Sequence, residues 1–392
     1  MANAILALNA GSSSIKFGVF EIGPGEPVAT VRGTVEENTD GGGRLDARDA
    51  SGRRLANQVL HPASKGSDGR IPWLLEWIDG HLGSARVVAA GHRIVHGGSD
   101  FVSACLLDTP AMAALAALTP LAPLHQPRSL APVQALKALR PDLPQYGCFD
   151  TAFHHGIAPP VSRYAIPRRY EDEGIRRYGF HGLSYEFIAS QLGVISPSLP
   201  GKRTVVAHLG NGASLCAMRH GRSLDTTMGF SALEGLMMGT RCGTIDPGIL
   251  LYLQQSQGLS ITDLEDLLYR QSGLLGVSGL SGDVRILLAS DDPRAKEAIE
   301  LFVLSLTRAV AVMANTLEGL ECLVFTGGIG EHSARIRALT CARLAWLGVR
   351  VDMDANEAGA KEISDPTSAV TVLVLATDEE LSIARHVVQI MA

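Results

Sequence analysis

The chain has 392 residues, and its 34 lysines and arginines stand against 40 aspartates and glutamates, which gives a formal net charge of −6 at pH 7. A nucleic-acid-binding protein would show a basic stripe or an excess of positive charge, so the composition argues against that class. Because 46% of the residues are hydrophobic and 19% are charged, the chain can bury a large core, which excludes global disorder, and its length is typical of two or three domains.

The sequence predicts neither a membrane segment nor a cysteine-based site. The opening residues 1–6 lack a basic stretch ahead of their apolar run, and no window reaches the roughly 18 uncharged apolar residues that a membrane span needs. We therefore expect a cytoplasmic protein that binds no membrane. The cysteines form no C-x-x-C pair, so we expect neither a zinc site nor a disulfide framework and interpret them as small buried side chains. The six are Cys105, Cys148, Cys216, Cys242, Cys322 and Cys341.

Two similar strand–loop–strand patterns occur in the two halves of the chain. The first joins apolar runs at 5–8 and 15–20 through a polar bend, and the second joins runs at 204–207 and 213–218 in the same way. Each pattern is typical of a β-hairpin with Gly and Asn in its turn. Their recurrence favours a duplicated domain, although two unrelated hairpins would give the same pattern.

The rest of the chain alternates predicted strands and helices. The segment 36–70 contains three consecutive glycines and many charges, so we expect an exposed, mobile excursion that carries no chemistry. Helices are predicted over 129–139 and, with one apolar face, over 292–319. Further strands are predicted over 322–325 and 370–375, and each is followed by a polar stretch and a helix. This alternation predicts an α/β fold.

Three glycine-rich bends follow predicted strands, at 9–14, 208–212 and 327–330. Such bends suit phosphate groups because backbone N–H groups can converge on an anion where side chains are missing. One bend alone is more often a structural turn, but three in one chain favour a phosphate-binding protein. Lys16, on the strand that leaves the first bend, can place a positive charge on a transferring phosphoryl group. The chain lacks the P-loop sequence G-x-x-x-x-G-K-[ST], and the third bend lacks the glycine spacing of a dinucleotide-binding fold.

Four further clusters, at 91–98, 148–154, 178–182 and 238–243, place ionisable side chains beside glycines or aromatic residues. That composition is expected where the backbone approaches a ligand closely. Taken singly, an arginine beside a glycine is more often a surface ion-pair partner, and a histidine is more often a hydrogen-bonded core residue. If two of the arginines and a histidine converge, they form a clamp for carboxylate or phosphate oxygens.

Taken together, these segments resemble the acetate kinase family of short-chain carboxylate kinases, within the larger group of actin-, Hsp70- and sugar-kinase-like folds. The resemblance covers essentially the whole chain. It implies an α/β protein of two duplicated actin-like (ribonuclease H-like) domains, each with a mixed five-stranded sheet, and an active site in the interdomain cleft. The matching segments are 9–16, 91–98, 149–153, 177–182, 208–214, 239–241, 327–331 and 377–380.

The resemblance also implies domain boundaries and an assembly. The first actin-like domain would cover 1–150, with a C-terminal helix over 380–392 that packs back on it. The second, nucleotide-binding domain would cover 151–379. The family implies a homodimer whose partners are small-molecule substrates rather than nucleic acid or membrane.

The implied activity is ATP + acetate ⇌ ADP + acetyl phosphate, by in-line transfer of the γ-phosphoryl group to a carboxylate oxygen. This agrees with the residues themselves, because a carboxylate is ionised at neutral pH and needs no general base, so catalysis can depend on positioning and charge neutralisation. By similarity, Arg93 holds the acetate carboxylate, Arg241 stabilises charge on the transferring phosphoryl group, and His181 donates a hydrogen bond to the transition state. Asp150 orients this cluster and helps to place the metal.

Cofactor, nucleotide and acyl-group positions are implied in the same way. Asn9 and Glu379 resemble the positions associated with Mg²⁺, with Mn²⁺ as a substitute, and oxygen ligands suit such an ion. The phosphates of ATP or ADP would be cradled by Ser12, Lys16, His208, Leu209, Gly210, Asn211 and Gly212. The adenosine side would be lined by Asp283, Val284, Arg285, Gly328, Ile329, Gly330, Glu331 and His332. A small pocket for the acyl methyl group would be lined by Val95, Leu124, Phe180 and Ala232.

Three departures from the family's pattern bear on these roles. His332 stands where relatives carry Asn, which affects a side-chain contact but not the backbone contacts of that loop. The segment 122–129 reads A-P-L-H-Q-P-R-S where many relatives read A-P-L-H-N-P-A-N. Ala232 replaces a proline of the acyl pocket. One methylene of extra space changes the discrimination between substrates that differ by one methylene by only about 1–3 kcal/mol. We therefore expect acetate as the principal substrate with noticeable propionate activity.

Other functions remain open at this point. A sugar- or glycerol-type kinase of the same superfamily would need an aspartate base, which Asp150 can supply, but it would leave Arg93 and Arg241 without a role. A nucleotide-driven binding module of the actin or Hsp70 type would carry a peptide-binding domain or a polymerising insert, which we do not find in the sequence. Among carboxylate kinases, propionate and butyrate kinases are the closest competitors.

Overall fold

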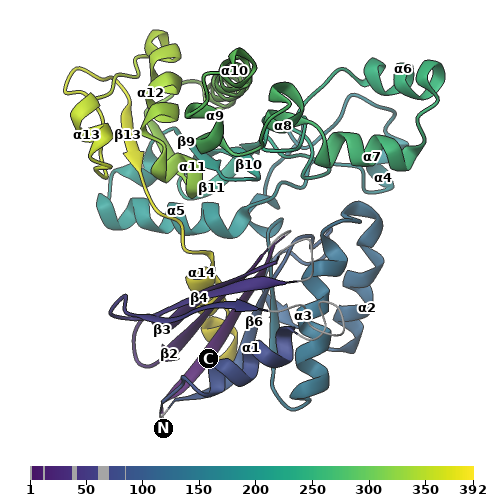
Figure 1. The fold of residues 1–392 in the computed structure, drawn as a ribbon, viewed down its shortest axis with the longest axis vertical. Helices are drawn as coiled ribbons and strands as arrows, with labels where there is room; N and C mark the ends of the chain where they lie inside the picture. The colour runs from purple at the N-terminus through teal and green to yellow at the C-terminus, as the bar shows by residue number, and fades with distance from the viewer. Residues whose placement is uncertain (1, 12–13, 38–41, 61–69, 84) are drawn as a thin grey trace. The chain divides into compact units, whose positions relative to one another are not determined.

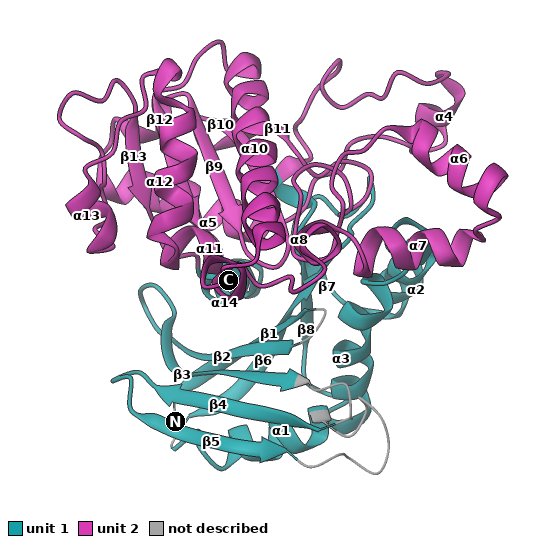
Figure 2. Ribbon diagram, turned by 45° about the horizontal axis from the view of Figure 1, so that its top comes forward, with its two compact units in different colours: residues 1–153, 378–392 teal, residues 154–377 magenta. Residues whose placement is uncertain are grey.

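The structure is a computed structural model, and the chain divides into two compact units (Figures 1 and 2). Unit 1 contains residues 1–153 and 378–392, and unit 2 contains residues 154–377. Each unit has its own sheet and its own buried core. The structure describes residues 2–11, 14–37, 42–60, 70–83 and 85–392.

Within the described residues, the sheet of unit 1 has eight strands in the order β5-β4-β3-β2-β1-β6-β8-β7. β1 and β2 form the predicted hairpin, in which Asn9 lies opposite Lys16. β6 runs parallel to β1, and β8 runs parallel to β6, so their carboxyl ends lie at one edge of the sheet. The strands are β1 (Asn3–Ala10), β2 (Ser14–Ile22), β3 (Val28–Glu37), β4 (Gly43–Asp49), β5 (Arg54–Leu60), β6 (Arg86–Ile94), β7 (Cys105–Leu106) and β8 (Gln145–Phe149).

Helices cover both faces of this sheet. Consecutive strand residues face opposite sides, and a Cβ placed on Gly91 would meet Ile383 of α14 at 2.4 Å. Its neighbour Ala90 belongs instead to the core cluster that contains Leu136 of α3. α14 packs on β1, β2, β6 and β8, so the last helix of the chain completes the core of the first unit. The helices of unit 1 are α1 (Arg70–Asp79), α2 (Thr109–Ala117), α3 (Gln126–Leu139) and α14 (Glu379–Met391).

The segment 36–70 does not form the exposed excursion expected from its charges. β4 pairs with β3, and β5 pairs with β4, so this segment extends the sheet beyond the five strands expected. Leu45 and Ala47 are fully buried, and their alternation with charged residues is the period-two pattern of a half-buried strand. The parts of the expectation that concern 38–41 and 61–69 lie outside the described residues.

Unit 2, all of whose residues are described, has a five-stranded sheet in the order β11-β10-β9-β12-β13. β9 and β10 form the second predicted hairpin, and β12 and β13 run parallel to β9. The long helix α10 packs on β9, β10 and β11. The strands are β9 (Thr204–Leu209), β10 (Ala213–Arg219), β11 (Arg222–Thr226), β12 (Cys322–Thr326) and β13 (Thr371–Val374).

The helices of unit 2 differ in length, from a single turn to the long α10. They are α4 (Arg169–Asp172), α5 (Gly182–Ile195), α6 (Pro247–Gln257), α7 (Ile261–Arg270), α8 (Gly273–Ser278), α9 (Val284–Leu288), α10 (Pro293–Thr316), α11 (Gly327–His332), α12 (Ala334–Arg343) and α13 (Met353–Glu357).

The two sheets share one topology. In each, a central strand pairs antiparallel with the next strand of the chain on one side and parallel with a later strand on the other, so that β3-β2-β1-β6-β8 corresponds to β11-β10-β9-β12-β13. Unit 1 adds β4, β5 and β7 to this shared set. The recurrence seen in the sequence is therefore a duplicated mixed α/β fold.

Two other predicted elements differ in detail. The helix predicted over 129–139 is α3, which begins three residues earlier, at Gln126. The third glycine-rich bend is the helix α11, whose first residue, Gly327, has a φ of 76°. The Gly327 N–H donates to the Glu331 carboxylate at 2.9 Å, which satisfies one of the donors that a helix start leaves open.

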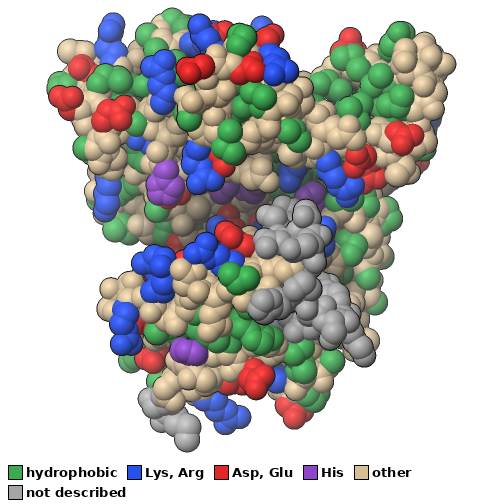
Figure 3. Space-filling view, in the orientation of Figure 1, with side chains coloured by type: hydrophobic (Ala, Val, Ile, Leu, Met, Phe, Trp, Pro, Cys, Tyr) green, Lys and Arg blue, Asp and Glu red, His purple; other side chains and the backbone are tan. Residues whose placement is uncertain are grey.

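On the face drawn in Figure 3, basic and acidic side chains are interspersed. Among the described residues, no helix is long and apolar enough to cross a membrane.

Candidate active site

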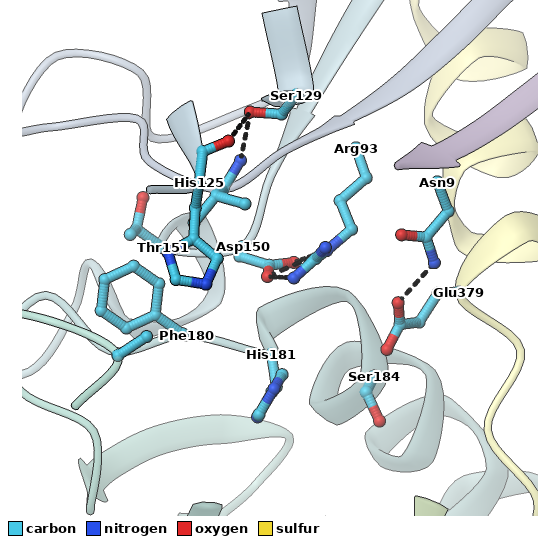
Figure 4. Close-up of polar contacts among 12 residues, drawn as sticks. Asn9, Arg93, His125, Ser129, Asp150, Thr151, Phe180, His181, Ser184 and Glu379 are labelled. Atoms are coloured by element: carbon cyan, nitrogen blue, oxygen red, sulfur yellow. Dashed lines mark hydrogen bonds and ion pairs between the residues drawn. The ribbon is translucent and has the colours of Figure 1, made fainter. Parts of the chain in front are cut away.

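The predicted anion-binding arginine of unit 1 lies at the edge where two parallel strands end. Arg93 is the penultimate residue of β6, and Asp150 directly follows β8, whose register pairs Arg93 with Cys148. The Asp150 N–H donates to the Ile94 carbonyl at 3.0 Å. Arg93 Nε donates to Asp150 Oδ1 at 3.1 Å and to Oδ2 at 3.0 Å, and Nη2 donates to Oδ2 as well (Figure 4). The strand register thus brings together two residues that are far apart in sequence.

This ion pair is buried, which makes its charge balance important. The Asp150 side chain is 1% exposed and that of Arg93 is 15% exposed. Burial alone would lower the pKa of Arg93, but the carboxylates of Asp150, Glu379 and Glu380 outweigh it, and the pKa is raised. Arg93 is therefore held as a fixed guanidinium, the group that matches a carboxylate ligand.

A second polar cluster lies at the end of β1. The side-chain amide of Asn9 donates to Glu379 Oε2 at 2.8 Å and to Glu380 Oε1 at 2.9 Å. Both glutamates belong to the first turn of α14, where the helix dipole favours negative charge. Burial, followed by the neighbouring Glu379, raises the pKa of Glu380, against the opposing effects of Lys16 and Asn9.

The donors of this cluster fit a hard divalent cation. They are an amide oxygen and two carboxylates, and burial of adjacent carboxylates leaves negative charge that a cation would neutralise. Among the described residues, no group of three or more His, Cys, Asp or Glu side chains is arranged to hold a metal ion. The oxygen donors of Asn9, Glu379 and Glu380 suit Mg²⁺, which keeps several waters and needs one or two protein carboxylates.

The departure at 122–129 has a structural role in unit 1. Gln126 is fully buried, and its amide accepts from the His96 N–H at 3.1 Å and donates to the carbonyls of His96 at 3.0 Å and Leu115 at 3.1 Å. The Val95 N–H donates to Ser129 Oγ at 3.5 Å. These bonds hold the turn that follows Arg93.

In unit 2, His181 is held by a chain of hydroxyl groups. It precedes α5 with a left-handed φ of 60°, a conformation that costs a residue with a side chain about 1–3 kcal/mol. Its Nδ1 is 2.8 Å from Ser214 Oγ, which is 2.5 Å from the Tyr185 hydroxyl. Its ring stacks on that of His208, with centroids 4.4 Å apart, and Ser184 Oγ is 2.8 Å from His208 Nδ1.

Arg241 and His181 approach the same loop. A Cβ built on Gly212 would lie 3.3 Å from His181 Nε2 and 3.7 Å from Arg241 Nη1, so both nitrogen groups lie over the glycine. Arg241 Nη1 also donates to the Ala232 carbonyl at 2.9 Å. The chain departs from the family at Ala232, yet the backbone of this residue still holds the arginine.

The predicted adenosine residues largely line one pocket of about 1010 Å³ in unit 2. Asp283 and Arg285 form an ion pair at its rim, with Arg285 Nη2 2.6 Å from Asp283 Oδ2. Hydrogen bonding to Arg285 lowers the pKa of Asp283. The predicted residues that line the pocket are Gly210, Asn211, Asp283, Val284, Arg285, Gly328, Ile329 and His332.

Some predicted site residues do not line this pocket. Leu209 is fully buried in β9. Gly330 packs against β12, and the Glu331 carboxylate accepts from the N–H groups of Gly327 and Thr377, so these two residues support α11. Lys16 is exposed on β2 in unit 1.

The residues predicted for the acyl pocket belong to different units, and one predicted phosphate-binding residue lies outside the described residues. Of the predicted acyl-pocket residues, Val95 and Leu124 belong to unit 1 whereas Phe180 and Ala232 belong to unit 2. Ser12 lies outside the described residues.

Sequence reasoning missed several side chains that hold this machinery. Ser214 and Tyr185 support His181, and Glu380 shares Asn9 with Glu379. Glu380 could have been identified from the sequence, because two adjacent glutamates in the first turn of a predicted helix can both reach one partner. Ser214 had none, since its partner lies in another element and only the fold brings the two together.

The duplicated mixed α/β fold, with Arg93 and Asp150 at the ends of two parallel strands, is that of the actin- and sugar-kinase-like class of proteins. Comparison of the sequence with known families is more specific, because the profile of the acetokinase family matches residues 4–385. The chain belongs to this family, and it is a transferase of the carboxylate kinase type.

Individual relatives agree with this assignment. An acetate kinase of Rhodopseudomonas palustris is 48% identical, over 99% of this chain and 98% of that protein. The solved structure of a propionate kinase from Francisella tularensis is 36% identical with a TM-score of 0.89, over 98% of both chains. The Porphyromonas gingivalis acetate kinase structure is 35% identical with a TM-score of 0.87, over 100% of both.

Proposed function

We propose that the protein transfers the γ-phosphoryl group of ATP to acetate, giving ADP and acetyl phosphate reversibly, with propionate as a secondary substrate. The names of its relatives, acetate kinases and a propionate kinase, support both substrates. The observation that carries the proposal is the buried Arg93–Asp150 pair, because it fixes a guanidinium where a small carboxylate can bind it.

The same pair argues against a hydroxyl kinase. Such an enzyme needs an aspartate that takes a proton from its substrate. Both carboxylate oxygens of Asp150 accept hydrogen bonds from Arg93, so we assign Asp150 to orienting the arginine. A carboxylate substrate is already ionised and needs no base.

In this assignment, the groups of unit 2 neutralise the charge of the transferring phosphoryl group. Arg241 and His181 supply a guanidinium and an N–H donor beside Gly212, and preorganised donors of this kind are the main source of catalysis in phosphoryl transfer. The loop 208–212 and Lys16 are assigned to the phosphates.

Asn9 and Glu379, assisted by Glu380, are the residues that would hold Mg²⁺ or Mn²⁺. The ion, when bound, neutralises phosphate oxygens of the nucleotide. The pocket of about 1010 Å³ is assigned to the adenosine part of ATP. His332, which lines this pocket, provides a side chain that can contact the nucleotide in place of the asparagine of the relatives.

We also propose that two copies of the chain associate. α6 has no buried residue, and its side chains Ile249, Leu251 and Tyr252 are exposed, so a second copy that covered them would remove apolar surface from water. The use of ATP as a co-substrate favours a cytoplasmic location. Light scattering of the purified protein tests the dimer, and the mass of a monomer would contradict it.

ATP-dependent formation of acyl hydroxamate tests the proposed reaction. Acetate, propionate, butyrate and glycerol are compared with Mg²⁺ present, on the wild type, Arg241→Ala and the control Arg270→Ala. Arg270 forms an exposed ion pair on α7, so its loss should leave the rate unchanged, whereas Arg241→Ala should lose about 10³-fold.

Each part of the proposal has its own refuting result. If no carboxylate reacts while ATP still binds, the carboxylate assignment is wrong. A kcat/KM for propionate below about one thousandth of that for acetate would refute the secondary activity, because one methylene is worth only about 1–3 kcal/mol.

A further inference from the structure

The hydrogen-bond chain behind His181 runs through two buried hydroxyl groups. Tyr185 lies one turn after His181 on α5 and is fully buried, as is Ser214 on β10. The Tyr185 hydroxyl is 2.5 Å from Ser214 Oγ, and Ser214 Oγ is 2.8 Å from His181 Nδ1. The three polar groups thus form a continuous line from the core to the imidazole.

The direction of the protons along this line follows from chemistry. A buried phenol must donate its proton to a hydrogen-bond acceptor, and Ser214 Oγ lies at hydrogen-bond distance from it. Burial raises the pKa of Tyr185 well above its ordinary value, so the phenol keeps its proton. Ser214 then accepts from Tyr185 and has its own proton to donate to His181 Nδ1.

An imidazole nitrogen that accepts a hydrogen bond forces the proton of the neutral ring onto the other nitrogen. In His181 that nitrogen is Nε2, which faces Gly212 and lies on the same side as Arg241 Nη1. The opposite direction, from His181 Nδ1–H through Ser214 to Tyr185, would leave Nε2 with a lone pair. A lone pair there would repel phosphoryl oxygens instead of binding them.

The ring is also fixed in orientation. It stacks on His208 with an interplanar angle of 22°, and His208 is itself held through its Nδ1 by Ser184. The backbone of His181 is left-handed, and its side chain makes no capping bond to α5. This is a strained conformation, which the hydroxyl chain and the stacked ring stabilise.

We propose that Tyr185 and Ser214 are positioning residues that hold His181 as the tautomer with its proton on Nε2, ready to donate to the transferring phosphoryl group. The proposal rests on the proposed kinase function for its consequence. The tautomer itself is a property of the resting protein and is measurable without turnover.

The test combines nitrogen NMR with kinetics. With ¹⁵N-labelled histidine and His181→Gln to assign the signals, the wild type should show a pyrrole-type Nε2 and a pyridine-type Nδ1 at a pH where the ring is neutral. In Ser214→Ala this pattern should shift toward a mixture of tautomers. Loss of the partner that orients a metal-binding histidine costs about 10–100-fold, and for Ser214→Ala we expect a loss of that order in kcat with KM values nearly unchanged.

Two further variants separate positioning from folding. Tyr185→Phe keeps the ring and removes only the hydroxyl, so we expect a smaller loss in kcat than for Ser214→Ala. Ser190→Ala is the control on the same helix, because Ser190 Oγ donates to the Phe187 carbonyl three residues earlier at 2.7 Å, and it should change neither signal nor rate.

The outcomes are distinguishable. A pyrrole-type Nδ1 in the wild type, or an unchanged tautomer pattern and kcat in Ser214→Ala, would overturn the proposed positioning role. A wild-type protein that binds ATP but phosphorylates no carboxylate would refute the proposed function, whatever the NMR signals show.

Discussion

Three buried neutral histidines should make this protein sensitive to acid. His92 and His96 flank the end of β6 in unit 1, and His154 begins unit 2, where it contacts Ser223 and the Phe180 carbonyl. Burial lowers the pKa of each to about 4, opposed in His92 by Gln145 and in His154 by Phe180. All three are at most 1% exposed.

The sign and size of the effect follow from proton linkage. Below pH 6.5, the ordinary histidine pKa, the unfolded chain binds protons that the folded chain does not, so stability is present above pH 6.5 and is lost as the pH falls toward 4. At pH 5 each histidine removes about 2 kcal/mol from the free energy of unfolding. Unit 1, with two of them, should lose about 4 kcal/mol, and unit 2 about 2 kcal/mol.

Urea unfolding at pH 8 and pH 5 measures this loss. Trp73 and Trp77 are both in α1 of unit 1, whereas Trp346 of unit 2 is 71% exposed, so tryptophan fluorescence mainly follows unit 1 and circular dichroism follows both. His92→Gln should lose about 2 kcal/mol less than the wild type between the two pH values. Equal losses in the variant and the wild type, or earlier acid unfolding of unit 2, would refute this reasoning.

Three substitutions test other parts of the structure. Asp150→Asn leaves the buried charge of Arg93 without its main partner, so urea unfolding should show a loss of about 3–5 kcal/mol; a loss under about 1 kcal/mol would mean that the pair is solvated. Glu380→Gln should raise the Mg²⁺ concentration needed for half-maximal activity without lowering stability, and an unchanged Mg²⁺ dependence would contradict the proposed site. Gly91→Ala forces a methyl group against Ile383 and should cost about 1–3 kcal/mol, whereas an unchanged urea midpoint would show that α14 can move away freely.

The parts of the fold that depend on local pattern were predictable. The hairpins at the head of each unit are read from apolar runs that flank Gly and Asn, and α10 is read from its apolar face and from Asp292-Pro293 at its start. β4 was missed because its charged residues concealed the alternation of Leu45 and Ala47. A segment rich in charged residues can therefore still form a strand, because its charged side chains lie on one face while the other face is buried.

Candidate site residues could be named from the sequence where a residue carries its own chemistry. Arg93 and Arg241 could be named from their glycine-rich settings, although their convergence with other groups could not. The partners that orient them come from strand register, as with Asp150, or from a carbonyl on another loop, as with Ala232. The Ser214–Tyr185 chain depends on the contact between a strand and a helix, which no spacing in the sequence encodes.

The return of α14 to unit 1 has a consequence for biosynthesis. Unit 2 is one continuous stretch of chain, so all of its residues have been made before Ile383 and Val387 are added. Until then, the face of β6 at Gly91 lacks the side chains that cover it, and the sheet of unit 1 presents apolar surface to water or to chaperones. The part of the protein that is translated first is therefore the part that completes its core last.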